Sequence, residues 1–165
     1  MKGNINLSLL MENSMEFEKL YKKLEETDIS DFYHVDTDFM LEIIKMGTAD
    51  IPDCLRIYST ISQWFGNSLR SGVWTYYEIA DMQDLQLTAQ YLSRCSWKEL
   101  HHMFCLGKHD YQSPQFIGNF NYPQKWIDES ESIDKWIWNN EKKLVEWQRE
   151  FLLIYRDEVC SLKRL

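Results

Sequence analysis

Apolar residues recur at helical spacing along almost the whole chain, and this periodicity restricts the possible fold more than any other feature. The first clear set lies at i, i+3, i+4 and i+7: Phe17, Leu20, Tyr21 and Leu24. Strand candidates are few, and the one at 116–120 is too short to build a sheet. The sequence therefore predicts an all-α bundle of about six or seven helices with a long C-terminal helix.

Capping residues predict where the first two helices begin and end. Asn13 and Glu16 form a candidate capping box before the first apolar stripe. Asp36 or Thr37 is the candidate N-cap of a second helix, and Gly47 is its candidate C-cap.

Further caps divide the middle of the chain. A third helix is predicted to begin near Asp50 and to stop at residues 66–67, Gly-Asn. Ser71 is the candidate N-cap of the next helix and Asp81 that of the following one. The capping box of residues 96–99, S-W-K-E, predicts another helix start.

The chain has a length typical of one domain, and we expect a single helical domain over residues 1–165. Residues 1–12 are a candidate disordered segment. Residues 108–131 contain two prolines, one glycine and several aromatics without a clear period, which predicts a long ordered loop. The helical period returns at Ser132 and continues to the C-terminus.

Cysteine usage and hydropathy indicate a cytoplasmic protein. The four cysteines are widely spaced and form no C-x-x-C pair, as expected for reduced thiols. The apolar run near the start is too short and interrupted for a signal peptide. No run approaches the roughly 18 apolar residues of a membrane span, so we expect no membrane partner.

Negative charge is concentrated in the first part of the chain. The formal net charge is −8, and residues 1–60 contain twelve acidic and six basic residues. Direct nucleic-acid binding is disfavoured, because it depends on clustered lysine and arginine. Carboxylates on helices could instead face a basic protein partner. The candidate partner-binding carboxylates are Asp28, Asp31, Asp36, Asp38 and Glu42. The alternative is that this acidity only keeps the protein soluble.

The stretch GNSLRSGVWTYYE, residues 66–78, combines a turn with aromatic residues. Trp74 and Tyr77 are three residues apart and can share the buried face of a helix. This leaves Arg70 and Tyr76 to face outward, and these residue types are enriched at interface hot spots. We therefore add both to the partner-binding candidates.

Histidines and cysteines near residue 100 form the one candidate metal site. His101 and Cys105 are i, i+4 neighbours, and His109 would extend the stripe if the helix continued past Gly107. The alternative is a hydrogen-bonded histidine in the core. Since the spacing matches no zinc pattern, the sequence predicts no cofactor.

Residues 71–77 also carry a family resemblance. Ser71, Gly72, Val73, Trp74 and Tyr77 stand where small acidic helical bacterial proteins have an N-G-G-F-x-Q-Y/F turn. The segment around them resembles this family, which includes a DNA-mimic protein. The chain departs from the motif by replacing Asn with Ser, the second Gly with Val and Gln with Tyr. The resemblance implies an all-α fold and a protein partner.

These observations favour a non-enzymatic cytoplasmic protein-binding module, such as an immunity or inhibitor protein that blocks a basic partner. No nucleophile, phosphate-loop or E-x-x-H motif supports catalysis. The alternative function is a small helical metal protein or enzyme centred on His101, His102 and Cys105. A second copy of the chain is a further candidate partner if the C-terminal tryptophans are not all buried: Trp136, Trp138 and Trp147.

Overall fold

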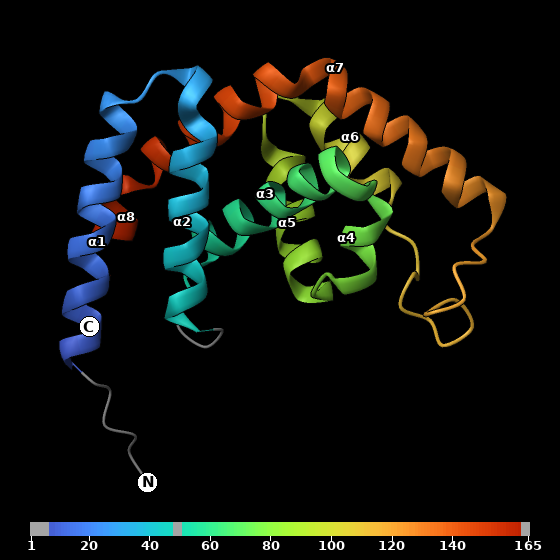
Figure 1. The fold of residues 1–165 in the computed structure, drawn as a ribbon, viewed down its shortest axis with the longest axis horizontal. Helices are drawn as coiled ribbons and strands as arrows, with labels where there is room; N and C mark the ends of the chain where they lie inside the picture. The colour runs from blue at the N-terminus through green and yellow to red at the C-terminus, as the bar shows by residue number, and fades with distance from the viewer. Residues whose placement is uncertain (1–6, 48–50, 163–165) are drawn as a thin grey trace, which may run out of the picture. The chain divides into compact units, whose positions relative to one another are not determined.

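The computed structural model describes residues 7–47 and 51–162, with only the backbone course described for residues 7–15. Eight α-helices and one 3-10 helix follow one another there (Figure 1): α1 (Leu7–Glu26), η1 (Ile29–Asp31), α2 (Phe32–Met46), α3 (Asp53–Ser71), α4 (Trp74–Ile79), α5 (Met82–Arg94), α6 (Lys98–Leu106), α7 (Gln124–Ile154) and α8 (Arg156–Cys160). These described residues contain no strand. The all-α prediction is confirmed, as is the long helix near the C-terminus, since α7 has 31 residues.

The first two helices begin earlier than the caps predict. Helix α1 starts at Leu7, so residues 7–12 are helical rather than disordered, while residues 1–6 lie outside the described residues. Helix α2 starts at Phe32 and contains Thr37, whose hydroxyl donates to the carbonyl of Tyr33 at 2.8 Å. A polar side chain can bond to its own helix in this way instead of capping it. Gly47 is the C-cap of α2, as predicted, with a φ of 74°.

Helix α3 continues through the predicted stop. Gly66 lies inside α3, and the Asn67 side chain donates to the carbonyl of Gln63 at 2.8 Å, within the same helix. Ser71 is the last residue of α3 rather than the N-cap of α4. The chain turns at Gly72, whose φ of 93° is one that glycine adopts readily. The Asp50 start lies outside the described residues.

Of the two helix starts predicted after α4, one is confirmed and the other is wrong. Asp81 is the N-cap of α5, as predicted, and accepts hydrogen bonds from the backbone N–H groups of Gln83 (2.7 Å) and Asp84 (3.3 Å). Helix α6 starts at Lys98 with Trp97 at the N-cap position, so the predicted capping box at residues 96–99 is wrong.

The segment between α6 and α7 is shorter than predicted. Helix α7 already begins at Gln124, directly after a proline, and the predicted loop over 108–131 is wrong for its last eight residues. Proline is favoured beside a helix start because it lacks an N–H group. The segment 107–123 contains turns and bends but no regular helix.

The described residues pack into two compact units: the part of the chain before Ser59 together with the part after Leu144, and residues 59–144. In the first unit α1 lies beside α2 (Figure 1). Its core is aromatic: the Phe39 ring packs edge-on against Tyr21, with centroids 5.1 Å apart. Tyr58 lies beside Phe39 and donates to the Asp36 carboxylate at 2.5 Å.

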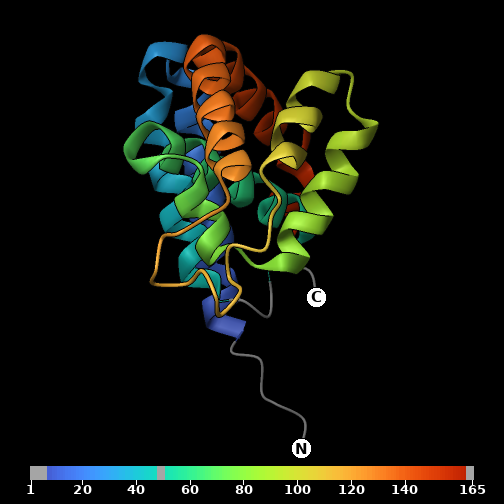
Figure 2. The same cartoon turned by 90° about the vertical axis from the view of Figure 1, so that its right-hand side faces the viewer.

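The second unit is built around a buried tyrosine. Tyr77 accepts a hydrogen bond from the indole N–H of Trp64 at 2.9 Å and donates to the carbonyl of Phe104 at 2.8 Å. Burial raises the pKa of Tyr77 well above its ordinary value, so the hydroxyl keeps its proton. These bonds link α3, α4 and α6. Helices α5 and α6 pack against each other within the same unit (Figure 2).

Among the described residues, no helix combines the length and the apolar character needed to cross a membrane. All four cysteines are thiols.

The close contact at Gly107 gives a test of the second unit's packing. A Cβ atom at Gly107 would lie 2.5 Å from the Tyr77 ring and 2.9 Å from Ile133. We expect Gly107→Ala to lower the free energy of unfolding by about 1–3 kcal/mol, because both neighbours must move. Urea denaturation measures this.

Gly66→Ala is the matched control. A Cβ atom there would meet no atom of the described residues within 4 Å, and the glycine lies inside α3. We expect this variant to be more stable than wild type by up to about 1 kcal/mol, since alanine favours the helix. Equal stability changes in the two variants would contradict the described packing around Tyr77.

Candidate functional site

The second unit contains a pocket of about 620 Å³ with four aromatic residues in its lining. Its volume lies in the range of small-molecule sites. Three parts of the unit supply the lining: the turn between α3 and α4, the segment 107–123, and the first half of α7. The lining residues are Ser71, Gly72, Trp74, Tyr111, Phe120, Tyr122, Ile127, Ser130, Glu131 and Asp134.

The aromatic rings of this pocket stand at steep angles to one another. Trp74 lies 6.0 Å from Phe120 at 77° and 5.8 Å from Tyr122 at 53°, measured between ring centroids and planes. Tyr111 lies 4.9 Å from Tyr122 at 70°. Rings inclined in this way cannot form one continuous stack. They can form separate walls of one hollow.

The hydroxyl groups of the two pocket tyrosines are already used within the unit. Tyr122 donates to the Glu78 carboxylate, and Tyr111 donates to the carbonyl of Trp126 at 3.5 Å. Burial raises the pKa of Tyr111 to about 12. Both hydroxyls therefore stay protonated and fix the orientation of their rings.

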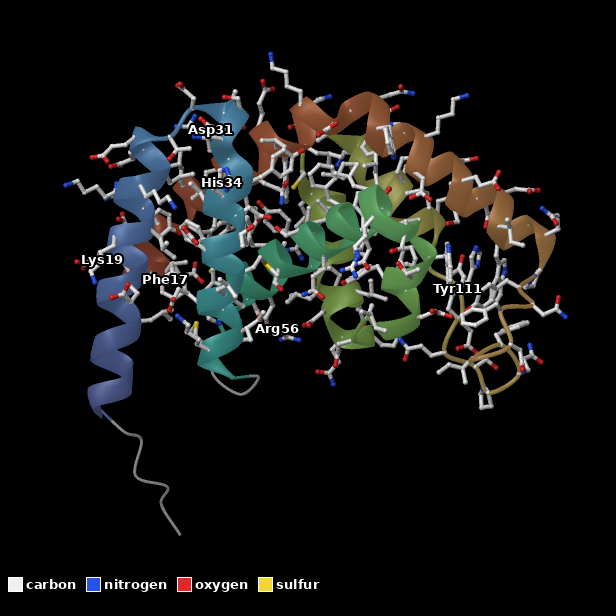
Figure 3. All side chains as sticks on the ribbon, viewed as in Figure 1. Phe17, Lys19, Asp31, His34, Arg56 and Tyr111 are labelled. Carbon is white, nitrogen blue, oxygen red and sulfur yellow. The ribbon has the colours of Figure 1, made fainter. Side chains whose placement is uncertain are left out.

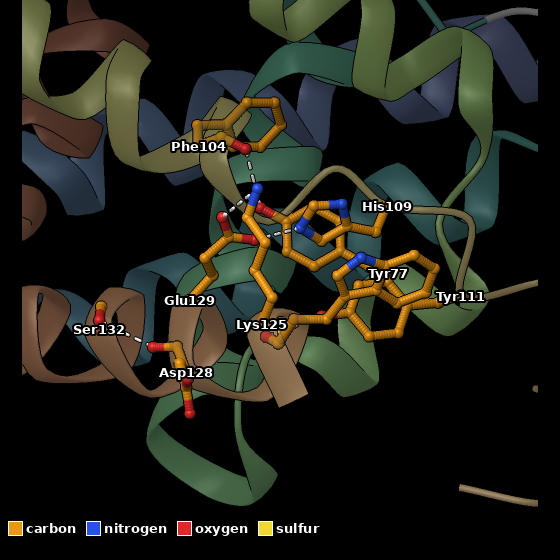
Figure 4. Close-up of polar contacts among 9 residues, drawn as sticks. Tyr77, Phe104, His109, Tyr111, Lys125, Asp128, Glu129 and Ser132 are labelled. Carbon is orange, nitrogen blue, oxygen red and sulfur yellow. Dashed lines mark hydrogen bonds and ion pairs between the residues drawn. The ribbon is translucent and has the colours of Figure 1, made fainter. Parts of the chain in front are cut away.

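The segment 107–123 is attached to α7 by His109. Its ring stacks on Trp126 with centroids 4.6 Å apart and planes 2° apart. Its Nε2 atom contacts the Glu129 carboxylate (Figure 4). Lys125 Nζ lies 3.8 Å from the other oxygen of Glu129. Stacking and hydrogen bonding together hold this segment near the helix that forms the opposite wall. Figure 3 labels Tyr111 in the same segment.

Asp134 is the central polar group of the pocket. Its Oδ1 atom accepts hydrogen bonds from the Ser68 hydroxyl at 2.5 Å and from the Val73 N–H at 2.9 Å. Burial raises the pKa of this carboxyl above its ordinary value of 3.8, and the two hydrogen bonds oppose that rise. One carboxylate thereby connects α7 to the end of α3 and the start of α4.

Gly72 makes this close approach possible. A Cβ atom at this position would lie 2.9 Å from the Trp74 ring and 3.3 Å from Asp134 Oδ2. Its left-handed φ of 93° would also strain any other residue. Trp74 can therefore lie at the pocket wall only because the preceding turn has no side chain.

The two predicted partner-binding residues of the second unit differ in exposure. Arg70 is exposed in the last turn of α3. Tyr76 is only 3% exposed, so the expectation that it faces outward is wrong. Tyr77 is buried as expected, whereas Trp74 is half-buried and lines the pocket. The ring that faces a cavity is thus Trp74 rather than Tyr76.

The five predicted partner-binding carboxylates all belong to the first unit. Asp28 and Asp31 are exposed around η1, and Figure 3 labels Asp31 there. The other three are half-buried and bonded to neighbours. Asp36 accepts from the Tyr58 hydroxyl, as described above. Asp38 pairs with Lys23 at 2.5 Å, and Glu42 pairs with the lysine three residues later.

The predicted histidine and cysteine stripe does not form. Helix α6 ends at Leu106, so His109 leaves the helix that carries His101 and Cys105, and contacts Glu129 instead. Among the residues that the structure describes, no group of three or more His, Cys, Asp or Glu side chains could hold a metal ion. Burial raises the pKa of the Cys105 thiol, which disfavours the thiolate that metals and electrophiles require. His102 is exposed.

The C-terminal tryptophans are not all buried. Trp136 is half-buried and packs 5.4 Å from the Trp97 ring, and Trp147 is half-buried against Phe151. Trp138 is 63% exposed. Single exposed rings are common on protein surfaces, and this one does not define an interface.

The sequence analysis did not predict that these residues form one pocket. Phe120 and Tyr122 stand in a segment without a period, and Asp134 has the spacing of an ordinary carboxylate on a helix surface. The available signal was the density of aromatic residues between 111 and 126, just before a helix with carboxylates in its first turns.

No protein-family model matches this chain, and neither a curated protein nor a solved structure matches it.

The raised pKa of Asp134 predicts a pH-dependent contribution to stability. The folded protein holds this proton to a higher pH than the unfolded chain does, so folding becomes more favourable as pH falls through the folded pKa. Asparagine has the same shape and does not titrate. We expect the stability of wild type relative to Asp134→Asn to rise as pH falls from about 7, and to level off below about 3, where both states are protonated.

Urea denaturation of both proteins over this pH range measures the difference. Ser68→Ala provides a second comparison, because it removes a hydrogen bond that lowers the pKa of Asp134. It should weaken the protein more at neutral pH than at acid pH. A constant stability difference between wild type and Asp134→Asn at all pH values would rule out this account of Asp134.

Proposed function

We propose that the chain is a non-enzymatic binding protein that takes a basic segment of a partner protein, as an immunity or inhibitor protein in the cytoplasm would. The observation that carries this proposal is the aromatic pocket of the second unit, with two carboxylates in its lining. Aromatic residues with a few placed polar groups are typical of binding sites.

Charge supports a basic partner. Among the residues that the structure describes, the pocket lining includes Glu131 and Asp134 and no lysine, arginine or histidine. Glu131 is exposed, so its charge is available to a molecule that approaches the pocket. The whole chain carries a formal net charge of −8, which attracts cationic partners over longer distances and raises their association rate.

Three of the four thiols do not favour the alternative of a cysteine enzyme. Burial raises the pKa of Cys54 to about 12 and also raises the pKa values of Cys95 and Cys105. A thiol with a raised pKa is a poor nucleophile at neutral pH. Reactive cysteines have the opposite shift, so these three offer no support for the alternative of an enzyme.

The first unit supplies a weaker candidate surface. Asp28 and Asp31 are exposed and could also meet a basic partner. Imitation of a DNA duplex, the role that the family resemblance suggests, would need a larger array of fixed negative charge. Three of the five candidate carboxylates there are bonded to neighbours within the unit. We therefore favour capture of a short basic protein segment over DNA mimicry.

Charge reversal at the pocket tests this function. Tagged wild type and a Glu131→Lys variant are compared as baits in lysate of the cells that produce the protein, with bound proteins identified by mass spectrometry. Because Glu131 is exposed, we expect the variant to stay folded and to lose a basic protein that wild type retains, since like charges repel at the rim.

Glu99→Lys, an exposed charge reversal on α6 outside the pocket lining, is the matched control and should retain the partner. A double variant, Asp28→Lys with Asp31→Lys, measures the contribution of the first unit. If the same proteins bind wild type and Glu131→Lys equally, the pocket is not the site of partner capture.

A further inference from the structure

We infer that the pocket holds an alkylated ammonium group, the trimethylated lysine side chain of a partner protein. This inference rests on the proposed function and names the chemical group that the pocket takes. It depends on three observations: the angles between the rings, the engagement of the polar atoms, and the sign of the charge at the rim.

The ring arrangement fits a rounded cation. Trp74, Phe120 and Tyr122 line one pocket, and their planes cross at 53° and 77°. The face of an aromatic ring attracts a cation within about 6 Å, and Trp does so most strongly. Several inclined rings around one hollow let one compact cation contact more than one of them. A planar guanidinium would instead require a flat stacking surface.

The polar atoms of the pocket favour an alkylated cation over a free ammonium group. A lysine ammonium has three N–H donors that must find acceptors when it leaves water. The Trp74 and Phe120 rings of the wall offer no strong acceptor to such donors. Asp134 Oδ1 already accepts two hydrogen bonds, so the charged acceptors left in the lining are its second oxygen and the exposed Glu131 carboxylate. A trimethylammonium group has no N–H to satisfy, and its methyl groups suit an apolar wall.

The carboxylates supply the complementary charge. Glu131 and Asp134 lie one helical turn apart on α7, and both line the pocket. A neutral apolar side chain of the same shape would have no electrostatic attraction to these two carboxylates. The pocket volume of about 620 Å³ also leaves room for the aliphatic stem that precedes the charged group.

Titration of the 165-residue chain with defined probes tests the inference. The probes are a basic peptide with trimethyllysine, and the same peptide with unmodified lysine or with neutral norleucine at that position. Binding is followed by calorimetry and by tryptophan fluorescence, since Trp74 lies in the wall. We expect the trimethyllysine peptide to bind most tightly of the three.

Two variants locate the interaction. Trp74→Leu should weaken binding of the trimethyllysine peptide by about 3- to 30-fold, the effect of removing one strong cation–π contact. Trp138→Leu is the control, because this exposed tryptophan lies on α7 outside the pocket lining. It should bind like wild type. Circular dichroism of both variants checks that the helices are intact.

Choline and its neutral carbon analogue, dimethylbutanol, distinguish a partner side chain from a free small molecule. If choline binds but the trimethyllysine peptide does not, the assignment to a partner protein is wrong. If the three peptides bind equally, or if Trp74→Leu binds the trimethyllysine peptide as wild type does, the inference fails as a whole. Loss of a partner by Glu131→Lys would in that case still support the proposed function, so the two failures are distinguishable.

Discussion

The Asp134 carboxylate connects three segments of the second unit that are far apart in sequence. It accepts one hydrogen bond from Ser68 at the end of α3 and another from the N–H of Val73, which leads into α4. A half-buried carboxylate loses hydration, and hydrogen bonds from the protein replace part of it. The position of Trp74 follows from this contact, because the same turn carries both the donor and the ring. The pocket has its shape because this turn is fixed against α7.

The buried hydroxyl of Tyr77 fixes the other side of the same unit. Trp64 donates to it and Phe104 accepts from it, so all three groups are satisfied away from water. Gly107 allows the ring to approach the end of α6, where any side chain would collide with it. The segment that leaves α6 at this glycine carries Tyr111 to the pocket. Only three residues, 108–110, therefore separate the core contact at Gly107 from the pocket wall at Tyr111.

Helical periodicity predicted the fold class and the long α7, because an apolar stripe on each helix must be buried whatever the partner helix is. Helix ends were predicted less well. Asn67 and Thr37 bond to carbonyls of their own helices instead of ending or starting them. Gly66 sits in open space, where a helix tolerates glycine at a cost of about 1 kcal/mol.

The candidate site could not be predicted from the spacing of residues, because its polar contacts join residues that are distant in sequence. Asp134 and Ser68 are 66 residues apart, and no local pattern relates them. Tyr76 was expected to face outward and is buried, whereas Trp74 was expected to be buried and is half-buried at the pocket. Both aromatic residues lie on α4, a helix of six residues. On so short a helix, the face that becomes buried is decided by tertiary contacts rather than by periodicity.

The division of the pocket between rigid helices and a connecting segment has an evolutionary consequence. Gly72, Trp74 and Asp134 belong to the helical frame and its turn, and substitutions there would disturb packing as well as the pocket. Phe120 is 62% exposed and stands in the segment before α7. Surface segments of this kind tolerate replacement and changes in length. Relatives could therefore diverge in the molecules they recognise by altering residues around Phe120, while inheriting the same scaffold unchanged.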